Sequence, residues 1–212
     1  LTTSARVWCW GEGRFGQLGD GLIVDRATPG ELSGNRQYTA MAVGGLHGCA
    51  IAVAGPTYCW AQGGQGQLGT GSTTNVSVPT LVTGGRLFVA IAAGYRHSCA
   101  LTAAGAAFCW GEGNHGQLGH SSNTNSSQPV AVSGGLTFSS ITAGFDHTCA
   151  TTVGGAAYCW SRGFGAQLRN KTTQDSNVPS AVVGGRTYTS LSAGFRHTCG
   201  VSSSVVYCWG MT

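Results

Sequence analysis

Charged residues are scarce in this 212-residue chain, in which Asp, Glu, Lys and Arg together make up 8% and Lys171 is the single lysine. The net charge of +4 comes from 11 basic and 7 acidic residues that are spread along the sequence. A surface that binds nucleic acid neutralises phosphates with clustered Lys and Arg. The scattered charges therefore disfavour a nucleic-acid partner.

Helix signals and long apolar runs are also missing. No capped stretch carries apolar residues at helical spacing, and no run approaches the roughly 18 residues of a membrane span. The chain has no initiator Met and no basic-then-apolar leader, so we expect a mature or excerpted segment. The 36 glycines among many Ala, Ser, Thr and Val favour an all-β protein of short strands and tight turns.

A catalytic constellation is absent as well. The acidic residues form no recurring pair, and Asp146-His147 is an isolated adjacency rather than part of a nucleophile, base and acid set. Four histidines each stand two residues before a cysteine, but their repeat units would place them on separate sheets, where they cannot converge on one metal ion. We expect each histidine to bond a neighbouring backbone group, and we expect no enzymatic activity, no metal and no cofactor. These histidines are His47, His97, His147 and His197.

The cysteines of the chain, in contrast, recur at regular intervals. One set recurs every fifty residues, and a second set follows it by nine or ten residues, each member standing before a tryptophan. A fixed period of this length indicates one structural unit repeated along the chain. The first set is Cys49, Cys99, Cys149 and Cys199; the second is Cys59, Cys109, Cys159 and Cys208.

Each unit contains four strand-like pieces, which in the second unit are residues 79–82, 88–94, 97–102 and 107–110. Four short strands broken by glycine turns are typical of a β-propeller blade. We therefore expect a single repeat domain, either a propeller or an open arc or spiral of blades. Its units are residues 28–61, 78–111, 128–161 and 178–210, with a surplus N-terminal strand at 5–11.

Three motifs carry a family resemblance. Gly-x-x-His-x-Cys-Ala-Leu, Gly-x-x-x-x-Cys-Trp-Gly and Gly-Gln-Leu-Gly recur in this order, and together they resemble the regulator of chromosome condensation repeat, here of a cysteine-rich, secreted type. The resemblance implies a propeller, usually seven-bladed, that presents loops to other macromolecules. The family includes an exchange factor for a small GTPase and a secreted inhibitor of β-lactamases, so both functions are rival predictions.

Strand register decides between two cysteine pairings. Cys49 opposite Cys59 centres a hairpin turn on Ala54, and the one-residue deletion in the last unit keeps Cys199 opposite Cys208 across a shorter turn. Disulfides within hairpins are therefore predicted for all four units. The alternative joins Cys9 to Cys49 and each later pair across the period, leaving Cys208 free.

Nine cysteines in an ordered pattern suggest an oxidising compartment. Three N-glycosylation sequons, at Asn75, Asn125 and Asn170, fall in corresponding loops. Together they predict a secreted or cell-surface glycoprotein.

We expect a non-enzymatic, secreted repeat protein that presents a binding surface to macromolecules or builds an extracellular assembly. The surplus strand presents an unpaired edge and the unpartnered Cys9, which favours self-assembly through this strand if the chain is a protomer. The same strand is equally compatible with an excerpt of a longer propeller or with a compact four-bladed ring. For a protein partner, side chains that vary at fixed repeat positions are the expected contacts: Arg96, Asp146, Arg196, Arg162, Arg169 and Lys171.

Overall fold

A computed structural model describes residues 5–211, and within this range it contains strands and no helix. The sheets are antiparallel, and the three complete ones have four strands each. The first comprises β3 (Tyr38–Val43), β4 (His47–Ala52), β5 (Thr57–Ala61) and β6 (Val76–Leu81). The second comprises β7 (Ala90–Ala93), β8 (His97–Leu101), β9 (Ala107–Gly111) and β10 (Ser126–Ala131). The third comprises β11 (Phe138–Ala143), β12 (His147–Thr152), β13 (Ala157–Ser161) and β14 (Ser176–Ala181).

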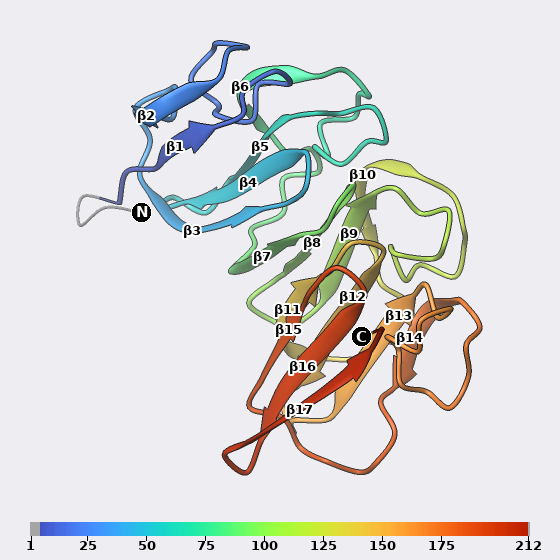
Figure 1. The fold of residues 1–212 in the computed structure, drawn as a ribbon. Helices are drawn as coiled ribbons and strands as arrows, with labels where there is room; N and C mark the ends of the chain where they lie inside the picture. Colours follow the sequence, from blue (N-terminus) through green and yellow to red (C-terminus); the bar gives the residue numbers. More distant parts are fainter. Residues whose placement is uncertain (1–4, 212) are drawn as a thin grey trace.

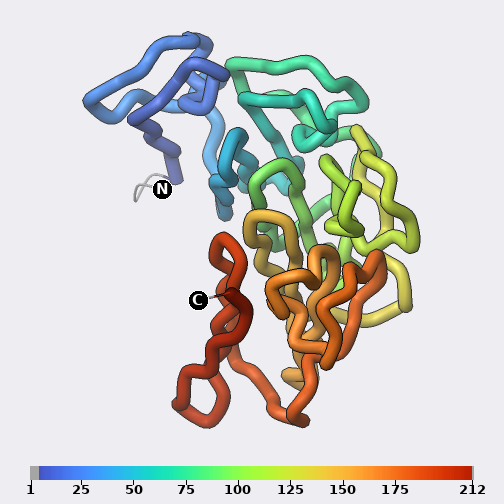
Figure 2. Tube along the Cα trace, turned by 45° about the vertical axis from the view of Figure 1, so that its right-hand side comes forward, coloured from blue at the N-terminus to red at the C-terminus, as the bar shows by residue number. Residues whose placement is uncertain are grey.

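Two partial sheets flank these three. β1 (Trp8–Gly11) pairs with β2 (Arg26–Glu31), and at the other end β15 (Ser190–Ala193), β16 (His197–Ser202) and β17 (Val205–Gly210) form a three-stranded sheet. Successive sheets stack as blades along an open arc, with the two ends of the chain apart (Figures 1 and 2). The inner strands β3, β7, β11 and β15 contact one another in this order along the arc.

The sheets are displaced by one strand from the units predicted from the sequence. The first strand of each predicted unit crosses to the preceding sheet, so that Leu81 of β6 lies opposite Tyr58 of β5. The complete blades therefore span residues 38–81, 90–131 and 138–181 rather than 78–111 and its equivalents. The physical reason is that the glycine-rich loop returns the chain to the outer edge of the strand it has just left. For the same reason β1 is not a lone strand, because β2 covers its outer edge.

The predicted hairpin register is observed in all four Cys-containing hairpins. Cys49 lies opposite Cys59, and Cys199 lies opposite Cys208 despite the shorter loop. Each pair is joined by a disulfide with a Cα–Cα distance of 4.1 Å. The alternative pairing across the period does not occur, and Cys9 is free.

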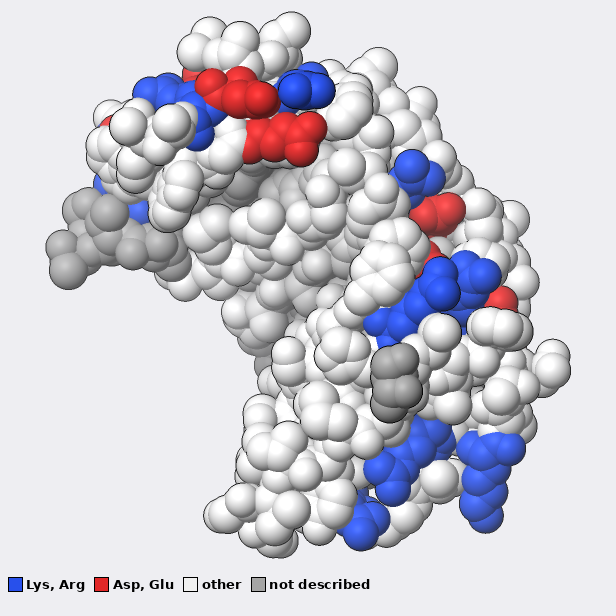
Figure 3. Space-filling view, in the orientation of Figure 1, with Lys and Arg blue, Asp and Glu red and all other residues white. Residues whose placement is uncertain are grey.

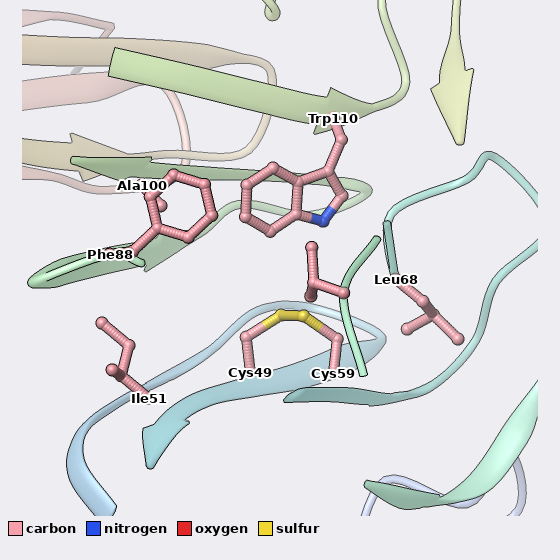
Figure 4. Close-up of a cluster of buried hydrophobic side chains, with 8 residues drawn as sticks. Cys49, Ile51, Cys59, Leu68, Phe88, Ala100 and Trp110 are labelled. Carbon is pink, nitrogen blue, oxygen red and sulfur yellow. A yellow bond between two sulfur atoms is a disulfide. The ribbon is translucent and has the colours of Figure 1, made fainter. Parts of the chain in front are cut away.

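The core lies between neighbouring blades and repeats with them. In Figure 4 the Cys49–Cys59 disulfide of one sheet faces Trp110 and Phe88 of the next, with Leu68 of the intervening loop closing the cluster. The next interface is built in the same way around the Cys99–Cys109 bridge. Every tryptophan in a complete sheet is buried there, because an indole ring fills the gap between two twisted sheets.

Candidate functional site: a protein-binding face

Each complete blade is fastened to the next by a buried histidine. His47 Nε2 lies 2.7 Å from Ser98 Oγ, His97 Nε2 lies 2.9 Å from Thr148 Oγ1, and the third contact, of the same kind, is His147 to Thr198 at 2.9 Å. The predicted backbone partner is wrong: the partner is a side-chain hydroxyl 51 residues later. The histidines therefore hold the blades together and do not form part of a site for a ligand.

The hydroxyl groups show that Nε2 of each ring carries a proton. Ser98 Oγ donates to the carbonyl of Gln67 at 2.9 Å, so its oxygen accepts a hydrogen bond from His47 Nε2. Thr148 Oγ1 donates in the same way to the carbonyl of Gln117 at 3.1 Å. Burial, which penalises the charged imidazolium, lowers the pKa of His47 to about 4 and that of His97 to about 3. The histidines of the blade interfaces are thus neutral near pH 7.

The glycine-rich loops also stabilise the interfaces between blades. Gln67 Oε1 accepts the backbone N–H of Gln65 at 2.8 Å, which closes the loop on itself, and Leu68 is buried. Trp160 Nε1 donates to the carbonyl of Gln117 in the preceding loop at 2.9 Å. The loop therefore supports the blade interface, as the Gly-Gln-Leu-Gly motif suggested.

A groove runs across the ends of the four inner strands, and we call it the axial groove. It encloses about 400 Å³ and is lined by residues 43–45, 93–95, 143–145 and 193–195, one short segment from each blade. Backbone hydrogen bonds connect the segments: Gly45 N donates to Gly94 O at 3.1 Å, and Tyr95 N donates to Phe145 O at 3.3 Å. Small Ala and Gly residues leave the groove open, and its wall is mostly apolar.

Three aromatic rings form a row along this groove, in which Tyr95 and Phe145 are stacked and Phe195 is tilted by 43° from Phe145. The centroids of Tyr95 and Phe145 are 4.1 Å apart, and those of Phe145 and Phe195 are 4.2 Å apart. The first blade carries Gly45 at this position, because a Cβ atom there would lie 2.1 Å from the Tyr95 ring. Phe195 remains 58% exposed. A row of aromatic side chains in an apolar groove is a typical anchor for a protein side chain.

Residues 96, 146 and 196, which directly follow the three aromatic residues, differ in their burial and contacts. Arg96 and Arg196 lie over the rings of Tyr95 and Phe195, with Cζ-to-centroid distances of 5.2 and 5.4 Å. Asp146 was predicted to be a surface contact, but it is only 6% exposed and pairs with Arg162 at 3.0 Å. Of the predicted trio at this repeat position, the two arginines lie over rings that line the groove, and Asp146 does not.

The loop of the fourth unit replaces three glycines found in other units. Ala166, Arg169 and Lys171 all adopt positive φ angles, of 57°, 47° and 69°. Arg169 places its Cζ 5.5 Å from the ring centroid of Trp209, and Lys171 is exposed. These two predicted contacts lie together beside a second pocket, which is separate from the axial groove.

Two of the three sequon asparagines stabilise their loops through a side-chain hydrogen bond to the backbone. Asn75 and Asn125 accept the backbone N–H of Gly63 and Gly113 at 3.0 and 2.9 Å, and aspartate does the same in the first and fourth units. Asn170 lies earlier in its loop and accepts the N–H of Thr172 instead. The three sequons therefore do not share one repeat position.

The aromatic row was not recognised from the sequence. Its signal is present, since residues 95, 145 and 195 each stand directly after the glycine of Gly-x-x-His, but the first unit interrupts the row with Gly45. Within residues 5–211, no group of three or more His, Cys, Asp and Glu side chains could hold a metal ion. The same range contains no helix with the length and hydropathy needed to cross a membrane.

Solved structures with the same architecture are found in several organisms. Human WBSCR16 is 24% identical over 96% of this chain and 55% of its own, with a TM-score of 0.88. Prp20p from Saccharomyces cerevisiae is 19% identical over 98% of this chain and 52% of its own, with a TM-score of 0.82. The ectodomain of the Physcomitrella patens receptor kinase CR4 is 27% identical over 100% of this chain and 48% of its own, with a TM-score of 0.66. The chain thus spans about half the length of these proteins.

No curated protein matches the sequence. The profile of the regulator of chromosome condensation (RCC1) repeat does match it, over residues 4–51, 54–101 and 104–151, and a second profile of the same repeat matches residues 88–117. These matches cover more than half of the 212 residues, and the sheets of the structure follow the same period. The chain therefore belongs to the regulator of chromosome condensation repeat family.

Proposed function

We propose that this chain is a non-enzymatic, secreted or cell-surface repeat protein that binds a protein partner through the axial groove. The observation that carries the proposal is the row of Tyr95, Phe145 and Phe195 along the apolar groove, with one ring from each of three successive blades. Exposed aromatic side chains in a preformed apolar groove are costly unless a partner covers them. The rigid, disulfide-braced blades hold these rings in place.

Several features support an extracellular location. Three of the four disulfides are fully buried, and bonds of this kind persist in oxidising compartments. Asn75 lies exposed in its sequon with its side-chain carbonyl oxygen bound, and we assign its amide nitrogen to a glycan. Asn125 is exposed in the same way, but its amide nitrogen donates to Gln65 Oε1 at 2.6 Å, a bond that a glycan there would replace. The receptor kinase CR4 domain with the same architecture is an ectodomain.

Other members bear on the rival functions. Prp20p has binding properties toward Gsp1p and histones, so a propeller of this family can take protein partners. An exchange factor for a GTPase and an inhibitor that caps an enzyme remain the alternatives to a general binding surface. An intracellular exchange factor fits the buried disulfides less well.

Self-assembly is a second candidate function, and it rests on the free edge of β1. Cys9 occupies the position at which each later unit has a cysteine bonded to the strand opposite, as Cys59 is to Cys49. We propose that β1 of another copy adds to this edge and brings its own Cys9 to this Cys9, because the other eight cysteines are already paired. The two thiols form one disulfide, and molecular oxygen takes up the two electrons and two protons that are released. Burial is the main factor that raises the pKa of the Cys9 thiol, which slows exchange near neutral pH.

The test compares the proteins that are retained by three immobilised forms of the chain. The wild type, the axial variant Tyr95→Ala/Phe195→Ala and the control Val153→Ala/Phe164→Ala are exposed to the same extracellular fluid. Val153 and Phe164 are 76% and 71% exposed and do not line the groove, so the control removes apolar surface elsewhere. A protein retained by the wild type and the control but lost from the axial variant supports the proposal. Equal retention by all three forms contradicts it.

The assembly candidate is tested by mass. Non-reducing gels and light scattering of the wild type and of Cys9→Ser should show disulfide-linked oligomers in the wild type only. A monodisperse wild-type monomer with a free Cys9 thiol would remove this candidate and leave the axial groove unaffected.

A further inference from the structure

The two arginines beside the axial groove have no acidic partner. Five ion pairs connect side chains of residues 5–211, and neither Arg96 nor Arg196 takes part in one. The Nε atom of each is buried without a hydrogen-bond partner. Arg196 Nη1 donates a weak hydrogen bond to Met211 Sδ at 3.9 Å, and the remaining Nη donors of both guanidinium groups can bind a carboxylate.

The carboxylates nearest in the fold are already occupied. Glu112 gives its backbone N–H to the carbonyl of Arg96, but its side chain accepts a hydrogen bond from Asn114 at 3.3 Å. Asp146, which stands between the two arginines in the repeat, is bound to Arg162. The charges of Arg96 and Arg196 are therefore left for a group outside this chain.

Their stacked position prepares both arginines for such a group. Each guanidinium lies over the aromatic ring that precedes it in sequence, which limits its rotamers and leaves its edge free for a bidentate contact. The C-terminal part of the chain is also positive, since residues 162–211 contain five basic residues and one acidic residue. Figure 3 shows Lys and Arg atoms without acidic neighbours in the lower part of the molecule, whereas both signs meet in the upper part.

We propose that the partner presents an acidic segment to the axial groove. An apolar side chain of this segment lies on the Tyr95, Phe145 and Phe195 rings, and flanking Asp or Glu side chains pair with Arg96 and Arg196. The groove volume of about 400 Å³ accommodates a few side chains rather than a folded domain. This inference rests on the proposed function and specifies the chemistry of its partner.

The probe is a short fluorescent peptide with acidic residues on both sides of a central leucine. Its counterpart replaces Asp and Glu by Asn and Gln. Binding of both to the wild type is measured by fluorescence anisotropy over a series of salt concentrations. The acidic peptide should bind, more weakly as salt rises, and the amide counterpart should bind at least about tenfold less tightly.

Two double variants with the same net charge distinguish binding at the groove from nonspecific electrostatic attraction between the acidic peptide and the positively charged chain. Arg96→Gln/Arg196→Gln should weaken binding of the acidic peptide by about tenfold or more. Arg36→Gln/Arg86→Gln is the matched control, because these arginines also lie over rings, but those rings, Tyr58 and Phe108, do not line the groove. The control should keep wild-type affinity within about twofold, since its charges lie at a distance that salt screens.

Three results would overturn the inference: no binding of the acidic peptide, equal binding of its amide counterpart, or equal losses in the two double variants. A different result separates this inference from the proposed function. A partner that is lost from Tyr95→Ala/Phe195→Ala but retained by Arg96→Gln/Arg196→Gln would leave the groove as the binding site and show that its partner is not acidic.

Discussion

His97 Nε2 and Thr148 Oγ1 lie 2.9 Å apart, although 51 residues separate them and they belong to different sheets. The threonine hydroxyl donates in turn to the carbonyl of Gln117 in the loop that joins β9 to β10 in the sheet of His97. One hydroxyl of a blade thus binds both a strand and a loop of the preceding blade. The contact recurs for His47 and His147, so the blade interfaces share one polar connection inside an apolar core.

Replacing Thr148 by valine should destabilise the chain by about 1–3 kcal/mol, because the shape is kept while the buried His97 N–H loses its acceptor and the Gln117 carbonyl keeps only Trp160 Nε1 as a donor. Urea unfolding measures the difference. Thr124→Val, at an exposed loop position, is the control and should change the unfolding free energy by less than about 0.5 kcal/mol. A Thr148→Val variant as stable as this control would show that the contact contributes nothing.

Acid should weaken the fold through the same histidines. The pKa values of His47, His97 and His147 are lowered to about 4, 3 and 4, so the unfolded chain binds protons first as the pH falls below about 6.5. Their stabilising effect is complete above that pH and is lost toward the folded-state pKa values. Each histidine contributes a slope of up to about 1.4 kcal/mol per pH unit. Urea unfolding between pH 7 and 5 should show this slope, and His97→Gln should reduce it by one proton; an unchanged slope would contradict the assignment.

The disulfides should be reduced in a defined order. Cys49, Cys59, Cys99, Cys109, Cys149 and Cys159 are fully buried, whereas Cys208 is exposed beside the open edge of β17. A thiol reductant needs access to a sulfur atom, so the Cys199–Cys208 bond should open first under native conditions. Timed alkylation followed by mass spectrometry measures the order. Simultaneous reduction of all four bonds would show that access requires global unfolding.

A single Cβ atom should disturb the aromatic row. Gly45→Ala places a methyl group 2.1 Å from the Tyr95 ring, and we expect a loss of about 1–3 kcal/mol together with weaker partner binding. Gly154→Ala is the matched control, because no atom lies within 4 Å of its added Cβ. Thermal unfolding and peptide anisotropy on both variants test this. Equal behaviour of the two would mean that Tyr95 can move aside without consequence.

The sequence predicts those features that depend on local spacing. Cys49 and Cys59 are ten residues apart, and the symmetry of a hairpin is enough to place them opposite one another. The same local argument identifies the glycine-rich loop and the strand before Trp110.

Long-range features could not be predicted in this way. The partner of His97 lies in the next sheet, and the first strand of each sequence unit crosses to the preceding one, because blade stacking and loop direction are set by tertiary packing. Asp146 and Arg162 appear as two variable surface positions in sequence and meet only in the folded blade. The aromatic row is likewise visible only when the blades stack.

The central claim is that a partner occupies the axial groove, and hydrogen–deuterium exchange with a partner recovered on the wild-type chain tests it most directly. Partner binding should slow exchange in three segments spaced by fifty residues, 93–96, 143–146 and 193–196, while exchange in the outer loop at 121–125 stays unchanged. Protection confined to the outer loops, or to the strand edges at 8–11 and 205–210, would contradict the claim.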